Sequence, residues 1–498
     1  MNAKQRIRNK ALLDRVMSAG EAAAKIKDGM VVAVSGFTSS GYPKLVPEAL
    51  AERARNGEDI DIDLYTGASV GPEIDGLFAE ADMIRRRLPY QTNGKLRSRI
   101  NEGRTEYVDI HLSQSPQYIN YGVVKSIDVA IVEAAGITEK GGIIPTASVG
   151  STPAFVKNSK KIIVEINTSI PAEIEGIADI MIPENPPMRK PINICHPADR
   201  IGTPYIECDP DKIIAVVFSD RKDTMRPFKE VDDVSKRISA HIIDFLEKEI
   251  AAGRLEKSLL PLQSGVGSVA NAVFYGLADY GYKDLTCYTE VVQDSMLDMI
   301  RNGNITAAST TAVSPSQEKM QEFLDDMEFF KSRIVMRPQD ISNSPEVIRR
   351  LGVIAMNTAI EADIYGNVNS THIIGSRMMN GIGGSGDFSR NAAISIFCTP
   401  STAKDGNISS IVPMVSHTDH TEHEVMVIVT EYGYADLRGL SPKERAIKII
   451  ENCAHPDYRD MLHDYFRRAC NSSALHTPHI PEEALSWHSR YLKTGCMK

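Results

Sequence analysis

The chain has 498 residues, a length that accommodates about three domains of roughly 150 residues each. With 42% hydrophobic residues, 24% charged residues, and 34 Gly and 26 Pro spread along the chain, the composition is globular and excludes collagen, a coiled coil and extensive disorder. The net charge of −9, from 56 basic and 65 acidic residues, argues against a nonspecific nucleic-acid binder, which needs a basic surface.

The first half of the sequence predicts alternating strands and helices. A strand at 31–37, a helix at 43–55 and a strand at 61–67 follow a βαβ rhythm. Further apolar, β-branched runs suit a mostly parallel sheet that is buried on both faces; they lie at 128–134, 161–167, 179–183 and 213–218. The polar segment 219–231, which contains Pro227, is the expected domain boundary.

The second half predicts a similar series. A helix is expected at 233–250, where apolar residues recur at helical spacing. Strands are expected at 285–290, 333–337, 352–357, 394–397, 408–414 and 425–431, and helices at 268–275, 316–330 and 442–452. We therefore predict an α/β protein of two open, mostly parallel-sheet domains, at 1–225 and 226–498.

Cysteine usage and apolar run lengths bear on the compartment. The seven cysteines are an odd number without a CxxC motif, so neither a disulfide framework nor a structural zinc site is indicated. The longest apolar runs, such as 213–218, are far shorter than the roughly 20 residues that span a bilayer. The N-terminus lacks the apolar core of a secretory signal. We expect a cytoplasmic protein, with an organellar one as the alternative.

Two glycine-rich turns are candidates for anion binding. The segment 379–388 has Gly381, Gly383, Gly384 and Gly386, and the segment 261–267 opens toward a predicted helix. Backbone N–H groups in such turns bind phosphates or stabilise oxyanions, although a purely structural turn is the alternative. The first segment matches neither a Walker motif nor a dinucleotide-binding fingerprint.

Two further features carry ionisable groups. Glu290 ends a predicted strand, where α/β sheets place ligands and catalytic groups, although a solvated strand-end glutamate is the competing interpretation. His417, His420 and His423 lie at three-residue spacing among acidic residues, and metal sites use such ligands. The spacing matches no closed motif, so we expect a polar hydrogen-bonding loop and no metal, with metal-dependent chemistry and a structural or adventitious ion as the alternatives.

Several long motifs in the same order resemble the acetyl-CoA hydrolase/transferase family, and within it the bacterial succinate (or propionate):acetate CoA-transferases. The motifs are YTEVVQD around Glu290, PLQSGVG at 261–267, NSPEVIRRL at 343–351, IYGNVNST at 364–371, MMNGIGGSGDF at 378–388 and EYGYADLRGLSP at 431–442. The resemblance extends from Ser35–Thr38 to Cys453–Tyr458, which is nearly the whole chain. It implies a class I CoA-transferase (NagB/RpiA-like) fold.

The resemblance also implies a chemistry and its residues. Glu290 matches a nucleophile that forms an acyl anhydride and then a glutamyl-CoA thioester. Val266 and Gly384 match backbone oxyanion donors, Asn343 lies near the thioester, and Glu431 lines the acyl pocket. The residues expected around CoA are Leu262, Gln263, Ser264, Gly265, Val266, Asn380, Gly384 and Lys404. The nucleophile and the CoA site are thus expected in the C-terminal domain.

Substrates and partners follow from the same resemblance. Acyl-CoA and small carboxylates are expected, in a homodimer, with no cofactor beyond CoA as a substrate and no nucleic-acid or membrane partner. Arg221 or Arg226 would hold the far carboxylate of a dicarboxylate. An acyl-CoA hydrolase that uses the same glutamate is one alternative, and an inactive CoA- or metal-binding protein is another.

Overall fold

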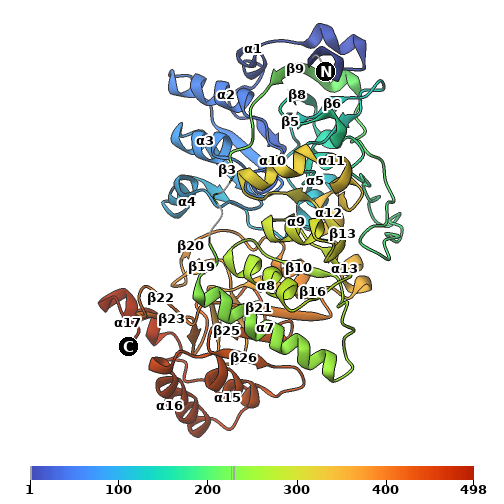
Figure 1. The fold of residues 1–498 in the computed structure, drawn as a ribbon. Coiled ribbons are helices and arrows are strands. Elements are labelled where there is room, and N and C mark those ends of the chain that lie inside the picture. Colours follow the sequence, from blue (N-terminus) through green and yellow to red (C-terminus); the bar gives the residue numbers. More distant parts are fainter. Residues whose placement is uncertain (1–2, 226, 228–229) are drawn as a thin grey trace. The chain divides into compact units, whose positions relative to one another are not determined.

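The computed structural model describes residues 3–225, 227 and 230–498, which form two compact units (Figure 1). Unit 1 takes in the chain up to residue 228 together with residues 286–351. Unit 2 takes in residues 229–285 and 352–498. The first division lies close to the boundary expected at 225/226. The units differ from the two expected segments because residues 286–351 pack with the N-terminal part of the chain.

Buried polar contacts hold residues 286–351 in unit 1. Arg337 is fully buried; its guanidinium pairs with the carboxylate of Asp179 and donates to the carbonyl of Pro197 at 3.1 Å and to Ser309 Oγ at 2.8 Å. A buried guanidinium is stable only when its donors are satisfied. Arg337 therefore fixes this segment against the loops that follow Asp179.

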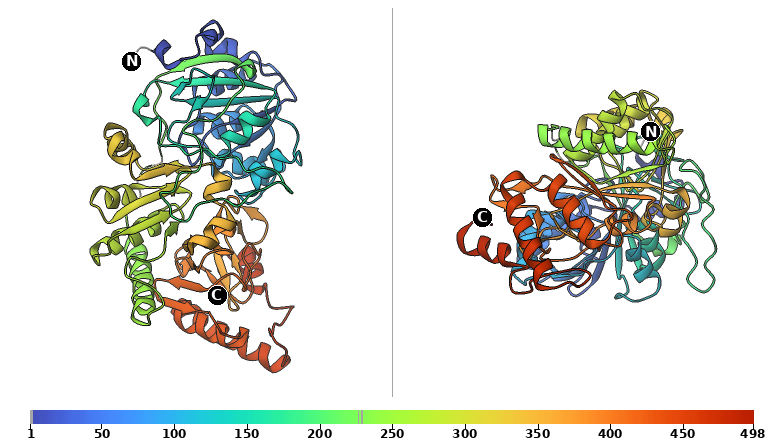
Figure 2. Two further views of the ribbon diagram at one scale, coloured as in Figure 1. Left: turned by 90° about the vertical axis from the view of Figure 1, so that its right-hand side faces the viewer. Right: turned by 90° about the horizontal axis from the view of Figure 1, so that it is seen from below.

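A seven-stranded sheet forms the centre of unit 1 (Figures 1 and 2). In spatial order its strands are β4 (Glu106–Tyr107), β3 (Ile84–Leu88), β2 (Ile62–Thr66), β1 (Val31–Val34), β5 (Val129–Ala134), β8 (Lys161–Asn167) and β9 (Ile213–Ser219). All six neighbouring pairs are parallel, which confirms the predicted parallel sheet. The strand predicted at 179–183 is wrong, because Ile180 forms only an isolated bridge with Thr203.

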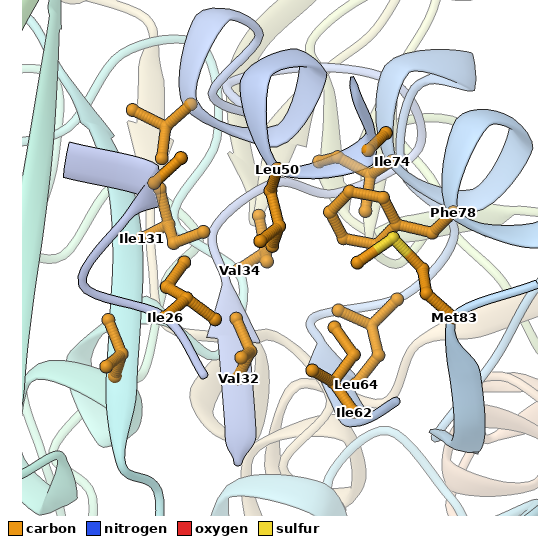
Figure 3. Packing of buried hydrophobic residues seen from close by; sticks show 14 of the residues in the cluster. Ile26, Val32, Val34, Leu50, Ile62, Leu64, Ile74, Phe78, Met83 and Ile131 are labelled. Carbon is orange, nitrogen blue, oxygen red and sulfur yellow. The ribbon is translucent and has the colours of Figure 1, made fainter. Parts of the chain in front are cut away.

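Apolar side chains from strands and helices fill one face of this sheet (Figure 3). Val32 and Val34 of β1 pack with Leu64 of β2, Leu50 and Phe78, and all are buried. The helices of unit 1 are α1 (Ala19–Ala23), α2 (Leu45–Arg55), α3 (Leu77–Glu80), α4 (Gly94–Asn101), α5 (Gln114–Asn120), α6 (Thr152–Asn158), α9 (Asp294–Arg301), α10 (Gln317–Asp325), α11 (Met327–Lys331), α12 (Gln339–Ser342) and α13 (Pro345–Leu351). The single helix predicted at 316–330 is two helices, since Asp326 leaves helical geometry with φ −121° and ψ 48°.

Three more strands of unit 1 lead to the candidate nucleophile. They lie in the order β15 (Ile334–Met336), β13 (Ile305–Thr310) and β11 (Leu285–Tyr288), and β13 pairs with β15 in parallel. Just beyond β11, the short strand β12 (Val291–Val292) pairs in parallel with β14 (Ala312–Val313). The hairpin of β6 (Gly136–Ile137) and β7 (Ile143–Ile144) completes the strands of this unit.

Unit 2 has a second open α/β sheet. Its strands lie in the order β10 (Leu262–Ser264), β16 (Ile354–Thr358), β21 (Ile394–Cys398), β25 (Val427–Thr430) and β26 (Gly433–Asp436). The first four are parallel and β26 is antiparallel to β25. The helices are α7 (Asp233–Ala251), α8 (Ser268–Asp279), α14 (Ser385–Ser389), α15 (Pro442–Cys453), α16 (Pro456–Ser472) and α17 (Ser486–Thr494).

Among its described residues, unit 2 also contains three small sheets. The long strand expected at 408–414 is instead two short strands that belong to two of these sheets. One has the order β18 (Val368–Asn369), β17 (Glu361–Asp363) and β24 (Ile411–Val412). Two hairpins pair β19 (His372–Ile373) with β20 (Arg377–Met378), and β22 (Thr402–Ala403) with β23 (Ile408–Ser409). Over the described ranges, no helix has the length and apolar character needed to cross a membrane.

Candidate active site

Glu290 lies two residues beyond the last residue of β11, at the carboxyl end of that strand. Its backbone carbonyl accepts hydrogen bonds from Thr310 Oγ1 at 2.8 Å, from the Thr311 N–H at 3.0 Å and from the Ala312 N–H at 3.1 Å. The pairing of β12 with β14 continues this attachment on the next two residues. The backbone that carries the Glu290 side chain is therefore fixed on both sides.

Asn343 orients the Glu290 carboxyl group. Its Nδ2 donates to Glu290 Oε1 at 2.7 Å. Asn343 is fully buried at the end of α12, and its own N–H donates to the Gln339 carbonyl at 2.8 Å. Its Oδ1 is buried and accepts no hydrogen bond from any described residue. One edge of the carboxyl group is thus held by a rigid amide donor.

The surroundings of Glu290 favour the protonated acid. Removal from water raises the pKa of Glu290 to about 7, and the hydrogen bond from Asn343 partly opposes that rise. A carboxyl group with this pKa is ionised in a substantial fraction at neutral pH, yet its anion is poorly hydrated. Such perturbed groups are typical of catalytic positions.

An apolar cluster follows Glu290 in unit 1. Val291 packs with Phe37, Ala68, Leu112 and Ala312, and Tyr90 lies against them. Phe37 belongs to a strained loop in which Thr38 and Ser39 have φ of 49° and 68°. Residues other than glycine avoid this region unless the surrounding structure enforces it. Here Ser314 Oγ donates to the Thr38 carbonyl at 2.6 Å and Ser40 Oγ donates to the Val313 carbonyl at 2.8 Å.

The residues expected around CoA lie in unit 2. Leu262, Gln263 and Ser264 form β10 and are buried, and the Gln263 side chain exchanges two hydrogen bonds of 3.3 Å with Asn357 on β16. Gly265 and Val266 follow, before α8 begins at Ser268. Val266 is 46% exposed, and its N–H bonds to no residue that the structure describes.

The second glycine turn precedes α14. Gly383 has φ 61°, in the left-handed region that glycine tolerates. Gly384, the residue before the first turn of α14, is buried with φ −97° and ψ 0°. The Gly384 N–H has no hydrogen-bond acceptor among the described residues. Val266 and Gly384, the two predicted oxyanion donors, thus each have a backbone N–H without an acceptor among the described residues.

Glu431 contacts Ser401, the residue just before the hairpin of β22 and β23, and Lys404 lies in that hairpin. Glu431 follows β25, and its carboxylate accepts from the Ser401 N–H at 2.8 Å and from Ser401 Oγ at 2.6 Å. Lys404 lies at the exposed tip of the hairpin with φ 52°, and no ion pair joins it to a described carboxylate. Ser401 was not anticipated from sequence. The available signal for Ser401 in the sequence was its position immediately before residues 402–405, which contain the predicted CoA residue Lys404.

The two arginines considered for a distal carboxylate differ. The Arg221 guanidinium pairs with Glu48 Oε1 at 3.1 Å on the surface of unit 1. Arg226 lies outside the described residues. Arg221 is therefore engaged in a surface ion pair, and the structure gives no geometry for the other candidate.

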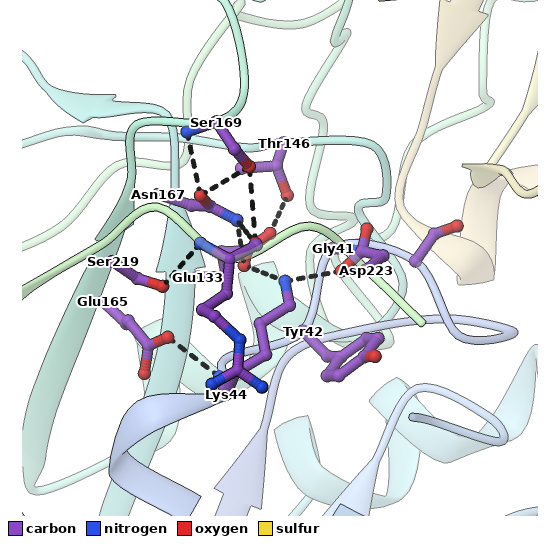
Figure 4. Close-up of polar contacts among 12 residues, drawn as sticks. Gly41, Tyr42, Lys44, Glu133, Thr146, Glu165, Asn167, Ser169, Ser219 and Asp223 are labelled. Carbon is purple, nitrogen blue, oxygen red and sulfur yellow. Dashed lines mark hydrogen bonds and ion pairs between the residues drawn. The ribbon is translucent and has the colours of Figure 1, made fainter. Parts of the chain in front are cut away.

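A buried ionic cluster in unit 1 was missed by sequence reasoning (Figure 4). Lys44 Nζ pairs with Glu133 and, at 2.5 Å, with Asp223, and all three side chains are buried. Asp223 also accepts from the Gly41 N–H at 2.9 Å. Nearby, Glu165 accepts from three N–H groups at the start of α2, of Lys44, Leu45 and Val46. The available signal was the presence of Glu133 and Glu165 inside apolar strand segments.

His417, His420 and His423 belong to the segment 415–424, the histidine-rich loop. In the described part of the chain, no group of three or more His, Cys, Asp or Glu side chains could hold a metal ion. His417 pairs with Asp419 at 3.3 Å and stacks on His372 with ring centroids 4.0 Å apart. His420 is fully buried, whereas His423 is exposed. The three side chains therefore lie in different environments.

Sequence comparisons identify the family. The acetyl-CoA hydrolase/transferase N-terminal domain matches residues 1–218, and the C-terminal domain of that family matches residues 317–466. The succinyl-CoA:acetate CoA-transferase of Clostridium kluyveri is 57% identical over 99% of this chain and 92% of its own. The chain belongs to the acetyl-CoA hydrolase/transferase family, which confirms the resemblance seen in its motifs.

Other relatives carry two different activities in their names. The acetyl-CoA hydrolase of Saccharomyces cerevisiae is 45% identical over 99% of this chain and 97% of its own. The propanoyl-CoA:succinate CoA transferase of Escherichia coli is also 45% identical, over 97% of this chain and 98% of its own. A 4-hydroxybutyrate CoA-transferase from Porphyromonas gingivalis shares the fold, with a TM-score of 0.63, 22% identity and coverage of 92% and 99% of the two chains. The predicted α/β fold is confirmed.

Proposed function

We propose that this protein is a CoA-transferase that moves CoA between a short acyl-CoA, such as succinyl-, propionyl- or acetyl-CoA, and a carboxylate such as acetate. The observation that carries the proposal is Glu290, a strand-end carboxyl group that Asn343 orients and that burial gives a pKa of about 7. The identity of 57% to a succinyl-CoA:acetate CoA-transferase supports this substrate class.

The proposed reaction proceeds in balanced steps on Glu290. The carboxylate attacks the thioester carbonyl, the C–S bond breaks, and CoA leaves as the thiolate, which yields an acyl-glutamyl anhydride. The thiolate then attacks the glutamyl carbonyl and expels the acyl group as a free carboxylate, which leaves a glutamyl-CoA thioester. An acceptor carboxylate repeats both steps in reverse, so the reaction needs no cofactor beyond CoA.

Each tetrahedral intermediate carries an oxyanion that needs hydrogen-bond donors. The N–H groups of Val266 and Gly384 are assigned this role, because neither has another acceptor among the described residues. Asn343 Nδ2 is assigned to the Glu290 oxygen that becomes the thioester carbonyl. Glu431 is assigned to the acyl pocket.

Residues of unit 2 are assigned to CoA itself. The turn at 262–266, Asn380 and Gly384 would contact CoA through backbone groups. The exposed Lys404 ammonium would meet its phosphates. This assignment supplies local positive charge in a chain of net charge −9.

Trapping of the thioester tests the proposal. Borohydride reduction of enzyme incubated with acyl-CoA is expected to modify Glu290 and to abolish activity, because the glutamyl thioester is reduced to an alcohol. Glu290→Gln keeps the shape and removes the nucleophile, so it should lose exchange between labelled acetate and acyl-CoA and escape reduction. Retention of full exchange by this variant would exclude Glu290 as the nucleophile.

An acyl-CoA hydrolase with the same nucleophile is the second candidate, since the chain is as similar to an acetyl-CoA hydrolase as to a propanoyl-CoA:succinate CoA transferase, at 45% identity to each. The two activities differ in whether water or a carboxylate attacks the glutamyl thioester. CoA release from succinyl-CoA or acetyl-CoA should be slow without acceptor and rise when acetate is added. Fast release without acceptor would favour the hydrolase.

We also propose a cytoplasmic homodimer. All seven cysteines are free, which supports a reducing compartment, and the family resemblance supports the dimer. Light scattering of the purified protein should give twice the chain mass of 54.8 kDa, and fractionation of cells should place the protein in the cytosol. A monomer, or recovery in another fraction, would exclude the corresponding part of this proposal.

A further inference from the structure

The buried histidine of the histidine-rich loop contacts the helix that follows the glycine turn of unit 2. His420 Nε2 lies 3.0 Å from Ser385 Oγ, and its Nδ1 lies 3.4 Å from Ser389 Oγ. Ser385 and Ser389 are the first and last residues of α14, and Gly384 immediately precedes that helix. The imidazole ring therefore spans both ends of the short helix that continues from the glycine turn.

Ser385 Oγ has a second hydrogen-bond partner besides His420. Its hydroxyl can donate to the carbonyl of Ile382, at 2.8 Å across the glycine turn. When the Ser385 proton points to Ile382, the same oxygen accepts from His420 Nε2, which also lies 3.4 Å from Ser370 Oγ. Nδ1 either accepts from Ser389 or donates to Glu424, whose Oε1 lies 3.5 Å away. A neutral imidazole has one N–H, so Nε2 donates to Ser385 when Nδ1 accepts from Ser389, and Nε2 accepts from Ser385 Oγ when Nδ1 donates to Glu424. The contact with Ser385 is present in both arrangements.

The ring has a fixed support of its own. The His420 N–H donates to the Val368 carbonyl at 3.0 Å, and its carbonyl accepts from the Val368 N–H at 2.8 Å. The preceding Asp419 accepts from the Ser370 N–H at 2.7 Å. The ring packs on Phe397 of β21 with centroids 4.6 Å apart. His420 is thus anchored to β18 and β21 independently of the glycine turn.

The glycine turn has less intrinsic rigidity than its support. Gly383, in the left-handed region, and Gly384 lack a Cβ and have many accessible backbone conformations. The hydrogen bond from Ser385 Oγ to the Ile382 carbonyl closes the turn around them. A donor that stabilises an oxyanion must be held in place before the charge develops. The N–H of Gly384 therefore depends on a contact that fixes Ser385.

We propose that His420 is a positioning residue: through Ser385 it holds the Gly383–Gly384 turn in the conformation that presents the Gly384 N–H to the reacting carbonyl. This inference rests on the proposed function, in which Gly384 is an oxyanion donor. It assigns the buried histidine of the loop to support of the catalytic turn, where the sequence had suggested metal ligation as an alternative.

The proposal predicts different kcat values for two substitutions of His420. His420→Met fills similar volume without a donor, whereas His420→Gln retains an N–H group. We expect His420→Met and Ser385→Ala each to lower kcat for CoA transfer by about 10- to 100-fold, because the turn loses its brace. His420→Gln should stay within about 3-fold of wild type, and KM for acyl-CoA should change little in all three.

His417→Met is the matched control in the same loop. The His417 side chain is 40% exposed, pairs with Asp419 and stacks on His372, so this variant should keep wild-type kcat. The double variant His420→Met/Ser385→Ala should be no slower than the more impaired single variant, because both substitutions break one chain of hydrogen bonds. Additive losses, or an unchanged kcat in either folded single variant, would overturn the proposal.

Amide hydrogen exchange provides a readout that does not depend on turnover. In the ligand-free protein, exchange across residues 380–389 should accelerate in His420→Met and Ser385→Ala and stay at the wild-type rate in His420→Gln. Unchanged exchange in the first two variants would refute the brace even if kcat falls. If the wild-type protein lacks CoA transfer while the two variants still exchange faster than wild type, the proposed function is refuted and the brace is not.

Discussion

At the scale of single residues, Glu290 has opposing demands from catalysis and folding. In the proposed reaction its carboxyl group must be ionised to attack a thioester, while its removal from water raises its pKa to about 7. The same environment that makes the anion poorly hydrated and reactive makes it costly in the folded state. Asn343 offsets part of that cost through its hydrogen bond.

The pH dependence of activity should report Glu290. Because only the carboxylate is nucleophilic, kcat/KM is expected to rise about tenfold per pH unit below pH 7 and to level off above it. Stopped-flow or steady-state rates of CoA transfer at low acyl-CoA concentration measure this profile in the free enzyme. A profile that stays flat between pH 5 and 8 would contradict the assignment.

Removal of the Asn343 donor should move that profile. Asn343→Ala removes the hydrogen bond that favours the ionised form, so the pKa of Glu290 rises and the midpoint of kcat/KM shifts to higher pH. The limiting rate should also fall by about 10- to 100-fold, since the thioester oxygen loses a donor. Ser342→Ala, next along α12, is the control; its hydroxyl is buried without a partner among the described residues, so the midpoint should not move.

Glu290 should also affect stability in a defined pH window. Its folded pKa of about 7 lies above the ordinary value of 4.5, so the folded state binds the extra proton between these pH values. The stability of the wild type is therefore lost as pH rises through this window. Glu290→Gln lacks this loss and should gain about 2 to 3 kcal/mol over wild type between pH 4 and pH 8. Denaturant unfolding at both pH values measures the gain, and an equal difference at both would contradict it.

The site was only partly predictable residue by residue. The strand-end position of Glu290 was visible in the pattern of the sequence, whereas Asn343 entered through family resemblance alone. Lys44 has no local signal, because its partners Glu133 and Asp223 are far away in sequence. Contacts of this kind depend on how strands are ordered in the sheet, which periodicity does not encode.

At the scale of elements, strands with continuous apolar runs were predicted well and charged ones were missed. The strand β8 has the expected bounds of 161–167. The strand β3, with the sequence IRRRL, was missed. Arg87, in this strand, is fully buried and donates to Asp75 at 2.9 Å, so its charge is compensated within the fold. Local hydropathy cannot register a partner of this kind.

A buried carboxylate joins two elements of unit 2 and should dominate their acid stability. Glu249 of α7 accepts from Arg438, which follows β26, at 2.9 and 2.7 Å, and from Arg254. These bonds lower the pKa of Glu249 to about 2. The stabilisation is complete above the ordinary carboxyl pKa and is lost as pH falls through the folded value.

Glu249→Gln is therefore expected to lower the free energy of unfolding by about 3 kcal/mol at pH 7. The difference from wild type should shrink below pH 4 and vanish near pH 2. Chemical denaturation across this pH range measures it. The exposed Glu256→Gln nearby is the control and should match wild type throughout; a loss at pH 7 of the same size in both variants would contradict the prediction.

At the scale of the whole molecule, chain order does not fix which segments pack together. Residues 286–351 follow the expected boundary yet belong to unit 1. Arg337 and its buried partners determine that membership, and they were not recognisable as partners in the sequence. The candidate nucleophile Glu290 consequently lies in unit 1, while the turns assigned to CoA lie in unit 2.

The Lys44 cluster ties the segment after β9 to the first sheet, and its charges should respond unequally to substitution. Burial raises the pKa of Glu133 to about 8, despite the opposing charge of Lys44. The protonated form of Glu133 is therefore favoured more than it is for a carboxyl group in water, and Glu133→Gln, which resembles that form, should cost about 1 kcal/mol or less at pH 7. Asp223→Asn removes a partner of a buried ammonium, and Lys44→Met removes the ammonium itself. Each should cost about 3 to 5 kcal/mol.

The sign of the pH effect distinguishes these variants further. The folded pKa of Glu133 lies above its ordinary value of 4.5, so wild-type stability is lost as pH rises from there through about 8, and Glu133→Gln should gain on the wild type over that window. Lys161→Met, on the exposed first residue of β8, is the matched lysine control and should unfold as wild type does. Urea unfolding monitored at pH 5, 7 and 9 tests the set. Equal losses for Glu133→Gln and Asp223→Asn at pH 7 would mean that Glu133 is ionised, and that the cluster holds two carboxylates against one lysine.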